Sequence, residues 1–474
     1  MRRKRGDNKG DNKGMERASG ILLHPTSLPG PAGIGDLGED AYRLADWLAE
    51  AGQKIWQVLP LGPVGYGESP YQLFSAFAGN PMLVATAVRA EGRPGGLPHV
   101  HFETIVPEKM AALRAAEFKM GAENLPWLDD FARFMALKAA NGGKAWWEWD
   151  PAVKADEREM EFHKRVQAEF FRQWCSLKRY CNDRGIRIMG DLPIYVAKDS
   201  ADVWARPELF RFDAVAGVPP DYFSAAGQLW GNPIYRWDRM KTDGYAWWIE
   251  RMRAALNIFD LVRLDHFRGF EAYWEVPAEE TTAVNGRWVK GPGSDLLRAL
   301  EKALGRLPIV AENLGVITPE VEAIRNEFEL PGMAVLQFAF GKDPQAPTFQ
   351  PHNYPRNLTA YTGTHDNDTV MGWWRSDGGD STRTPEDVVK EKAKARAYLA
   401  TDGREMNWVM IRELMKSVAD TVVFPMQDVL GLGSEARMNT PSTASGNWRW
   451  RMTEHASKED ARRLREMAEL YKRA

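Results

Sequence analysis

The chain has 474 residues, with 62 Lys and Arg against 65 Asp and Glu and a formal net charge of −3. This near balance provides no electrostatic attraction to nucleic acid or to a membrane surface, so we expect an uncharged partner. The 19 Trp, 13 Tyr and 20 Phe are a heavy aromatic content. Most of these rings belong in a core, but flat rings with a polar edge also suit stacking on sugar faces.

The cysteine content and the N-terminal segment both favour an intracellular protein. Cys175 and Cys181 are the only cysteines and lie on a predicted helix, so there is no disulfide framework and we expect a reducing cytoplasm. The start is basic and contains a GDNK duplication, but no apolar segment typical of a signal peptide follows. We expect residues 1–19 to be a disordered extension, with Met15 as a second plausible start. No stretch approaches the ~18 apolar residues of a membrane span.

Short apolar runs bounded by Gly, Pro, Asp and His alternate with helical patterns along the chain. The segment EDAYRLADWLAEAG (39–52) has the apolar spacing of an amphipathic helix and ends on Gly. There are eight apolar runs, which is the number of strands that a closed parallel barrel requires. The pattern therefore predicts an α/β fold, a (β/α)8 TIM barrel with insertions. The runs are GILLH (20–24), WQVLPL (56–61), IRIMGDLPI (186–194), DLVRLDHF (260–267), PIVAENLG (308–315), MAVLQFAF (333–340), LTAYTGTHD (358–366) and TVVFPMQDVL (421–430).

Two connections are too long for plain loops and predict insertions into a single catalytic barrel domain of residues 20–474. Residues 62–185 contain helical stretches such as FARFMALKAANG, which predict a helical insertion after the second strand. Residues 195–245 are rich in Pro, Gly, Asp and aromatic residues. Long ordered loops at one face of a barrel usually shape a site or close over it, so we expect this segment to form lid and substrate loops.

Three of the apolar runs end on a carboxylic acid. Asp265 ends FDLVRLD, Glu312 ends PIVAE, and Asp366 follows His365 in TGTHDND. Because the C-terminal ends of parallel strands meet at one face of a barrel, we expect these acids to lie together. Arg263 stands two residues before Asp265 and therefore shares its face of the strand, where a guanidinium keeps a carboxylate ionised.

The spacing of neighbouring strands predicts a chemistry for these acids. Strands lie ~4.8 Å apart, which brings Asp265 and Glu312 close to the ~5–5.5 Å separation of carboxyl groups in retaining glycosidases. Asp265 would attack an anomeric carbon, while Glu312, its pKa raised by the neighbouring negative charge, would protonate the leaving oxygen. Asp366 would stabilise an oxocarbenium-like transition state, and His365 is a natural partner for a sugar hydroxyl.

Structural alternatives stay open for single residues. A lone acid at a strand end is more often a loop cap or an ion-pair partner, and His–Asp pairs also form structural hydrogen bonds or metal sites. Asp191, at the end of the third run, is as compatible with a structural role as with a site. Tyr71 in GYGESPYQLFSAFAGNP (65–81) fits a stacking wall under a sugar or a packing position at the barrel rim. The chain has no HExxH or CxxC motif, so we expect no metal site and no cofactor.

Several long motifs together resemble the 4-α-glucanotransferase family known as amylomaltase or disproportionating enzyme, a branch of the α-amylase clan. The resemblance covers nearly the whole chain after Met15. The motifs that carry it are HPTSLPGPAGIGDLG (24–38), GYGESPYQLFSAFAGNP, GDLPIYVAKDSADVWA, PPDYFSAAGQLWGNPIYRW, RLDHFRGF, AENLGVIT, YTGTHDNDT and PMQDVLGLGSEARMNTPSTASGNWRWR (425–451).

The resemblance implies a role for each matching residue. Asp265 corresponds to the nucleophile, Glu312 to the acid/base and Asp366 to the transition-state stabiliser. The residues that correspond to sugar contacts of the donor site are Arg263, His365, Asp191, Ser69 and Tyr71, with Asn439 as a further contact.

Two aromatic residues correspond to features outside the donor site, and two positions depart from the family. Trp230 stands in the loop that covers the bound chain near the acceptor side, and Tyr66 matches a tyrosine of a second, remote glucan groove. Asn313 replaces an aspartate often found beside the acid/base, which affects the expected pKa of that acid. Ser442-Thr443-Ala444 replaces a frequent Gly-Arg-Pro stretch.

We therefore predict an enzyme that cleaves α-1,4-glucans and maltooligosaccharides and passes the donor chain from Asp265 to the 4-hydroxyl of another glucan or glucose. An α-amylase-like hydrolase, in which water takes the same intermediate, is the alternative. Sequence separates the two only through the resemblance and the covering loop around Trp230. A catalytically inactive glucan-binding protein is a rival of another class, which would have lost an acid, whereas all three acids are present. The oligomeric state is not predicted.

Overall fold

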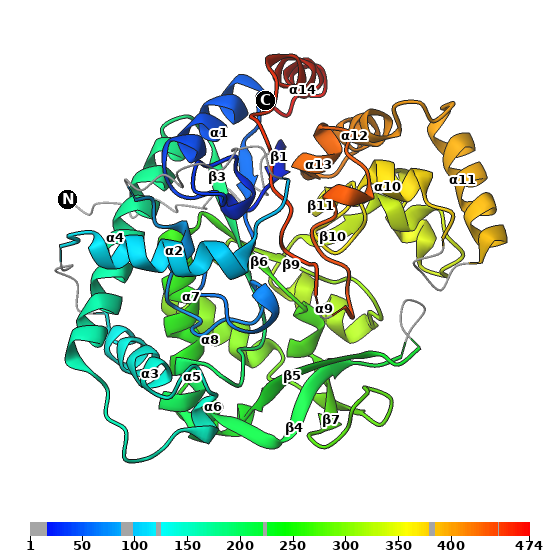
Figure 1. Ribbon diagram of the computed structural model, residues 1–474. Helices are drawn as coiled ribbons and strands as arrows, with labels where there is room; N and C mark the ends of the chain where they lie inside the picture. Colours follow the sequence, from blue (N-terminus) through cyan, green and yellow to red (C-terminus); the bar gives the residue numbers. More distant parts are fainter. Residues whose placement is uncertain (1–16, 87–97, 120–124, 221–224, 379–383, 444) are drawn as a thin grey trace, which may run out of the picture.

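The computed structural model describes residues 17–86, 98–119, 125–220, 225–378, 384–443 and 445–474. Eight parallel strands form one sheet in the order β10-β11-β12-β1-β2-β3-β6-β9 (Figure 1). The strands are β1 (Ala18–Leu22), β2 (Ile55–Gln57), β3 (Arg187–Leu192), β6 (Leu261–Leu264), β9 (Ile309–Ala311), β10 (Gly332–Val335), β11 (Leu358–Tyr361) and β12 (Thr421–Pro425). The amide of Ala311 in β9 donates to the carbonyl of Pro331 before β10 (2.8 Å), which brings the two ends of the sheet together. The predicted (β/α)8 barrel is confirmed.

All eight predicted runs contribute one strand to this sheet, in the predicted order. The strands are shorter than the runs, because the last residues of each run leave the ladder and form the rim of the barrel. The first strand begins earlier than expected. Ala18 and Ser19 are buried and pair with Thr421 and Val422 of β12, so they belong to the barrel and not to the expected extension. The rest of that predicted extension, residues 1–16, lies outside the described residues.

Helices surround the strands (Figure 1). In α1 the residues Ala41, Leu44, Ala45 and Leu48 are buried, the i, i+3, i+4, i+7 pattern of a helix with one apolar face. The connection between β10 and β11 is an exception, because it contains only 3-10 turns. No helix in the described part of the chain is long and apolar enough to cross a membrane. The helices that follow barrel strands are α1 (Glu39–Glu50), α4 (Glu157–Asn182), α7 (Ala246–Ile258), α8 (Ser294–Leu304), α9 (Pro319–Glu327), α10 (Val370–Arg375), α11 (Pro385–Leu399), α12 (Met406–Lys416), α13 (Met426–Val429) and α14 (Lys458–Leu470).

The connection between β2 and β3 is helical, as the sequence indicates. It contains α2 (Phe102–Ala115) and α3 (Leu128–Ala140) ahead of α4, and α3 packs against α4. Helix α4 begins at an Asp156 cap whose carboxylate accepts from the amide of Arg158. Its buried face includes Phe170 and Trp174, which lie against the barrel.

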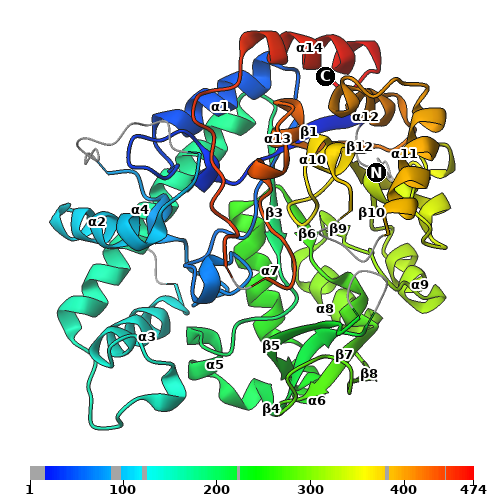
Figure 2. The ribbon, with the colours of Figure 1, turned by 45° about the vertical axis from the view of Figure 1, so that its right-hand side comes forward.

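A second sheet lies beside the barrel and was not predicted. It has the order β5-β4-β7-β8, all antiparallel, and Figure 2 shows it below the barrel strands. Its strands are β4 (Phe210–Val218), β5 (Gln228–Tyr235), β7 (Ala272–Pro277) and β8 (Arg287–Lys290), with α5 (Ala201–Ala205) and α6 (Trp237–Thr242) on either side of the first two. Residues 195–245 therefore contain regular strands where loops were expected. Gly231 and Pro233 inside β5 are turn-forming residue types, but β5 is an edge strand, where a missing N–H is tolerated.

Gly190 in β3 tests how tightly the barrel is packed just before Asp191. A Cβ at this position would lie 2.1 Å from Cδ2 of the buried Phe259 ring. Gly190→Ala should therefore lower the free energy of unfolding by about 1–3 kcal/mol through overpacking, which thermal unfolding measures as a lower Tm. Gly341→Ala is the control, because the nearest atom to its Cβ would be 3.9 Å away. Equal shifts of Tm in the two variants would contradict the packing argument.

Candidate active site

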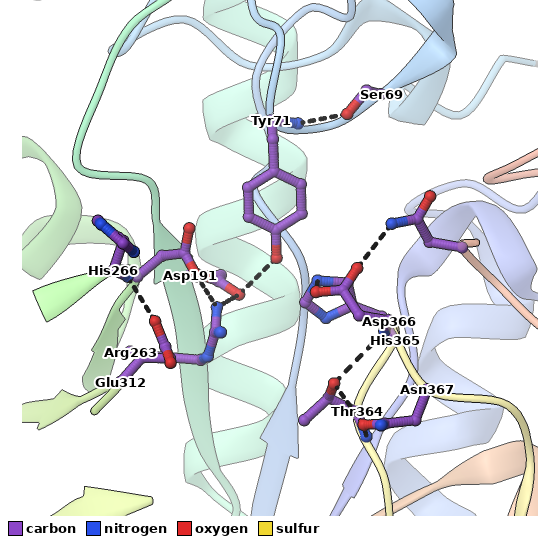
Figure 3. Close-up of polar contacts among 12 residues, drawn as sticks. Ser69, Tyr71, Asp191, Arg263, His266, Glu312, Thr364, His365, Asp366 and Asn367 are labelled. Carbon is purple, nitrogen blue, oxygen red and sulfur yellow. Dashed lines mark hydrogen bonds and ion pairs between the residues drawn. The ribbon is translucent and has the colours of Figure 1, made fainter. Parts of the chain in front are cut away.

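The C-terminal ends of four barrel strands bring the predicted acids to one rim. Asp191 lies in β3, Asp265 follows β6, Glu312 follows β9, and His365 and Asp366 follow β11. Strands β3, β6 and β9 are consecutive in the sheet, with β11 beyond β10. Figure 3 shows the Arg263 and Glu312 side of this rim facing the His365 and Asp366 side, with Tyr71 between them.

A single guanidinium joins two of the acids. Nη1 of Arg263 lies 2.7 Å from Oδ2 of Asp191 and 2.8 Å from Oδ1 of Asp265. Burial acts to lower the pKa of Arg263, but the two carboxylates raise it well above its ordinary value. Burial raises the pKa of Asp191 to about 6, with Arg263 acting in the opposite direction. The side chain of Asp191 is fully buried, whereas that of Asp265 is 24% exposed, so Asp265 is the carboxylate that a substrate can reach.

Glu312 is the acid whose environment favours its protonated form. Burial, and then the charge of Asp265, raise the pKa of Glu312 to about 7, although Arg263 and two backbone amides act against this shift. Those amides belong to His266, which donates to Oε2 (2.7 Å), and Leu314, which donates to Oε1 (2.8 Å). The raised pKa agrees with the sequence-based expectation, but burial contributes more than the neighbouring charge. A carboxyl group of this kind can donate a proton near neutral pH.

His266 is a site residue that the sequence analysis missed. It follows Asp265 directly, and its backbone is left-handed with φ 52° and ψ 50°, a conformation that residues other than glycine rarely adopt. This turn directs the His266 amide at Glu312, so one residue connects the two acids. The motif RLDHFRGF contains His266, but its contribution comes from the backbone, which a side-chain pattern does not reveal.

Asp366 has the opposite electrostatics to Glu312. Its Oδ2 lies 3.3 Å from Nε2 of His365, and its Oδ1 accepts from Nδ2 of Asn439 (2.6 Å). Removal from water by itself would raise the pKa of Asp366, but His365 and then Asn439 lower it well below the ordinary value. The backbone N–H of Asn439 also donates to the backbone carbonyl of His365 (3.0 Å). The rim therefore holds an ionised Asp366 on the side opposite Glu312, which retains its proton near neutral pH (Figure 3).

The loop that carries Asp366 is held at both ends by a buried carboxylate. Thr362 donates its hydroxyl to Oδ2 of Asp428 (2.6 Å), and the amide of Val370 donates to Oδ1 (2.7 Å). Asp428 is 0% exposed and lies in α13, directly after β12. Nothing in the sequence pattern indicated this residue, because the contact joins positions that are far apart along the chain.

Tyr71 forms a wall between the two sides of the rim. Its hydroxyl donates to Oδ2 of Asp191 (2.8 Å), and its ring stacks on His365 with centroids 5.2 Å apart (Figure 3). Ser69 fixes the local backbone, since its Oγ accepts from the amide of Tyr71 (3.2 Å). Trp448 completes the wall, with its ring centroid 5.8 Å from those of Tyr71 and His365. Trp448 was also missed, because its place depends on the path of the C-terminal segment.

The two remaining aromatic residues lie further out. Trp230 belongs to β5 and not to an irregular loop, and its ring contacts His266 edge-on at 4.8 Å and lies 6.4 Å from Tyr195. Its indole N–H donates to Oε1 of Gln228 (3.1 Å). Tyr66 lies in the same connection as Tyr71, but its side chain is 87% exposed and stands apart from the acids.

The two positions that depart from the family pattern, Asn313 and Ser442, fit their surroundings in different ways. Asn313 donates Nδ2 to Oε1 of Glu322 and accepts the amide of Met333 on Oδ1, both at 2.7 Å. An aspartate at this position would place a second negative charge against Glu322, so the amide suits its neighbour. Ser442 has φ 66°, which is the left-handed region that the frequent glycine would adopt without strain.

Comparisons with known proteins agree with this geometry. A family model described as 4-alpha-glucanotransferase matches residues 23–457. The 4-alpha-glucanotransferase of Thermus thermophilus is 49% identical over 97% of this chain and 99% of its own length, and that of Synechocystis sp. is 48% identical over 92% and 94%. The solved structure of an amylomaltase from Streptococcus agalactiae in complex with acarbose has a TM-score of 0.88 and 37% identity, covering 97% of this chain and 100% of that one. The chain belongs to the 4-α-glucanotransferase family.

Proposed function

We propose that the protein is a 4-α-glucanotransferase that moves a segment of an α-1,4-glucan or maltooligosaccharide to the 4-hydroxyl of an acceptor glucan or glucose. The observation that supports this most directly is the pairing of a reachable Asp265 carboxylate with a Glu312 whose pKa is raised to about 7. The proposal treats the barrel and its insertions as one catalytic unit. The presence of only two cysteines in the sequence supports a reducing, cytoplasmic location.

In the first step, Asp265 attacks the anomeric carbon of the donor. The bond from that carbon to the bridging oxygen breaks, and Glu312 gives its proton to the leaving oxygen. The products are a glycosyl ester on Asp265 and a shortened glucan with a free 4-hydroxyl. In the second step, the ionised Glu312 takes the proton of an acceptor 4-hydroxyl, which attacks the same carbon and releases Asp265. Two inversions leave the α-configuration unchanged.

The other rim residues bind and orient the sugar in this scheme. Asp366 is ionised and stabilises the positive charge that develops on the ring, while His365 and Asn439 hold its carboxylate in place. Asp191 is fully buried and acts through its neighbours in this scheme, because its Oδ2 accepts from the Tyr71 hydroxyl and pairs with Arg263. Tyr71 supplies an aromatic face beside it. Arg263 holds Asp265, Ser69 sets the backbone of Tyr71, and Tyr66 remains a candidate contact of a remote glucan groove.

Transfer, as opposed to hydrolysis, requires that an acceptor sugar reacts before water does. Water is present at ~55 M, so the acceptor needs a high effective concentration at the intermediate. Trp230 on β5 is suited to this task, because its ring lies over His266, next to Asp265. The relatives that are named 4-alpha-glucanotransferase favour transfer over the α-amylase-like alternative.

Incubation with maltotriose tests the proposed activity. The wild-type protein should produce glucose together with a ladder of longer maltooligosaccharides, which chromatography resolves. Asp265→Asn should lower the rate by about 10⁴-fold or more without loss of fold, as the removal of a nucleophile does elsewhere. Products no longer than the donor would favour the hydrolase, and early NMR spectra with β-anomeric product would contradict the double displacement.

The protonation of Glu312 predicts a limb of the pH profile. Because the first step needs the protonated acid, kcat/KM should fall about tenfold per pH unit as the pH rises above the pKa of about 7. Glu312→Gln should abolish activity on maltotriose but still release about one equivalent of fluoride from α-glucosyl fluoride, whose leaving group needs no proton, and then accumulate the glycosyl ester because the base of the second step is missing. The fluoride donor should also lack the alkaline limb. A wild-type profile that stays flat to pH 9, or loss of the initial fluoride release along with maltotriose cleavage, would exclude Glu312 as the acid.

Trp230→Ala tests the role of the covering ring. Loss of acceptor stacking should slow transfer more than hydrolysis, so the ratio of free glucose released to chain transferred should rise several-fold. Trp230→Phe is the matched variant, since it keeps an aromatic face and should retain most of the transfer. Equal loss of both rates together with a lower Tm would indicate that Trp230 only packs β5.

A further inference from the structure

Two loops that are far apart in the sequence meet beside the Tyr71 wall. Arg449 lies 381 residues after Glu68, and its guanidinium makes two hydrogen bonds to that carboxylate, from Nε to Oε2 (3.0 Å) and from Nη2 to Oε1 (2.9 Å). This bidentate geometry is the strong form of an Arg–carboxylate pair. The side chains are 27% and 31% exposed, so the pair is neither fully buried nor free in solvent. A third side chain, Glu103, accepts one longer bond from Nη1 (3.3 Å).

Both loops have a strained backbone at the contact. Glu68 has φ 60° and follows Gly67 with φ 66°, and Trp448, directly before Arg449, has φ 65°. The left-handed region is disfavoured for residues with a Cβ, and such conformations persist only where the surrounding structure holds them. The ion pair between Glu68 and Arg449 joins these two strained segments, so it can stabilise both left-handed conformations.

The joined segments carry the aromatic wall of the site. Trp448 packs against both Tyr71 and His365, and Tyr71 stands three residues after Glu68. A movement of either loop would therefore change the distance between Tyr71 and His365, whose rings stack at 5.2 Å.

We propose that Glu68 and Arg449 are positioning residues: their ion pair holds Tyr71 and Trp448 against His365 and thereby sets the affinity of the sugar site. We call this pair the rim clamp. The assignment of a sugar site to this wall rests on the proposed function. Because the rim clamp is partly exposed, salt screens it. The binding of an uncharged sugar then becomes sensitive to ionic strength, although the sugar itself carries no charge.

The test is calorimetric titration of maltotriose into Asp265→Asn protein, which does not turn the sugar over. Glu68→Gln, Arg449→Gln and the double variant are added to this parent. Each single change should weaken binding by about three- to tenfold, and the double change should weaken it no further, because the two side chains act as one unit. The affinity of the parent should fall between about 0.01 M and 1 M salt, where the screening length drops from ~30 to ~3 Å, while that of the double variant should stay constant.

Glu405→Gln is the matched control. Arg463 also holds Glu405 with two bonds (2.8 and 3.2 Å) at side-chain exposures of 37% and 62%, but this pair joins α14 to the start of α12, away from the aromatic wall. The control should keep the parent's affinity and its salt dependence. Additive losses in the double variant, or the same salt dependence in every protein, would overturn the rim clamp.

Hydrogen exchange separates failure of the clamp from failure of the proposed function. In the protein without sugar, Glu68→Gln should speed exchange of the hydrogen-bonded amides of Tyr71, Gln72 and Trp448, and leave the barrel strands unchanged. Unchanged exchange at these amides would overturn the rim clamp by itself. A parent that binds no maltotriose would count against the proposed function, while faster exchange would still support the clamp as a device that orders the wall.

Discussion

The guanidinium of Arg263 is the buried positive charge around which the rim is organised. It lies within 2.8 Å of both Asp191 and Asp265, and Arg263 and Asp191 are register partners on the neighbouring strands β6 and β3. Buried charges are costly unless they are paired, so Arg263 and the fully buried Asp191 depend on each other. Burial, and then the charge of Asp265, explain why the nearby Glu312 retains its proton near neutral pH, although Arg263 acts against this shift.

Glu312 and Asp366 differ in protonation state because different groups face them. Glu312 faces Asp265 and, among the described residues, accepts hydrogen bonds from two backbone amides, whereas Asp366 faces His365 and the side-chain amide of Asn439. A glycosyl transfer needs one acid that can lose and regain a proton and others that stay ionised throughout. The barrel meets this need because β9 and β11 place the two acids on different sides of the same rim, where their neighbours differ.

The sequence predicts the parts of this arrangement that depend on local pattern. Apolar runs that end on an acid located β6, β9 and β11, and the period of two placed Arg263 beside Asp265. The sheet of β4, β5, β7 and β8 was not predicted, because Pro and Gly inside β5 are typical of turns and only the edge position makes them acceptable. Side chains such as Asp428 and Trp448 act through contacts with residues distant in the chain, which no local pattern contains. The His266 amide is hidden for another reason, since every residue has an amide and only the left-handed turn directs this one at Glu312.

Backbone strain at the rim lies where the site needs a side chain or a backbone amide to point in a direction that regular structure does not provide. His266, Glu68 and Trp448 are all left-handed without being glycine, and each lies beside an acid or an aromatic wall residue. The barrel strands underneath are buried and regular. They can therefore stabilise left-handed conformations that an isolated loop would not keep. Asp191, Asp265 and Glu312 are fixed at the ends of ladder strands, whereas Asp366 and the sugar wall are fixed through long-range side-chain contacts. Because the two means of support are separate, substitutions of Glu68 or Arg449 can change sugar affinity while leaving the protonation of Glu312 intact.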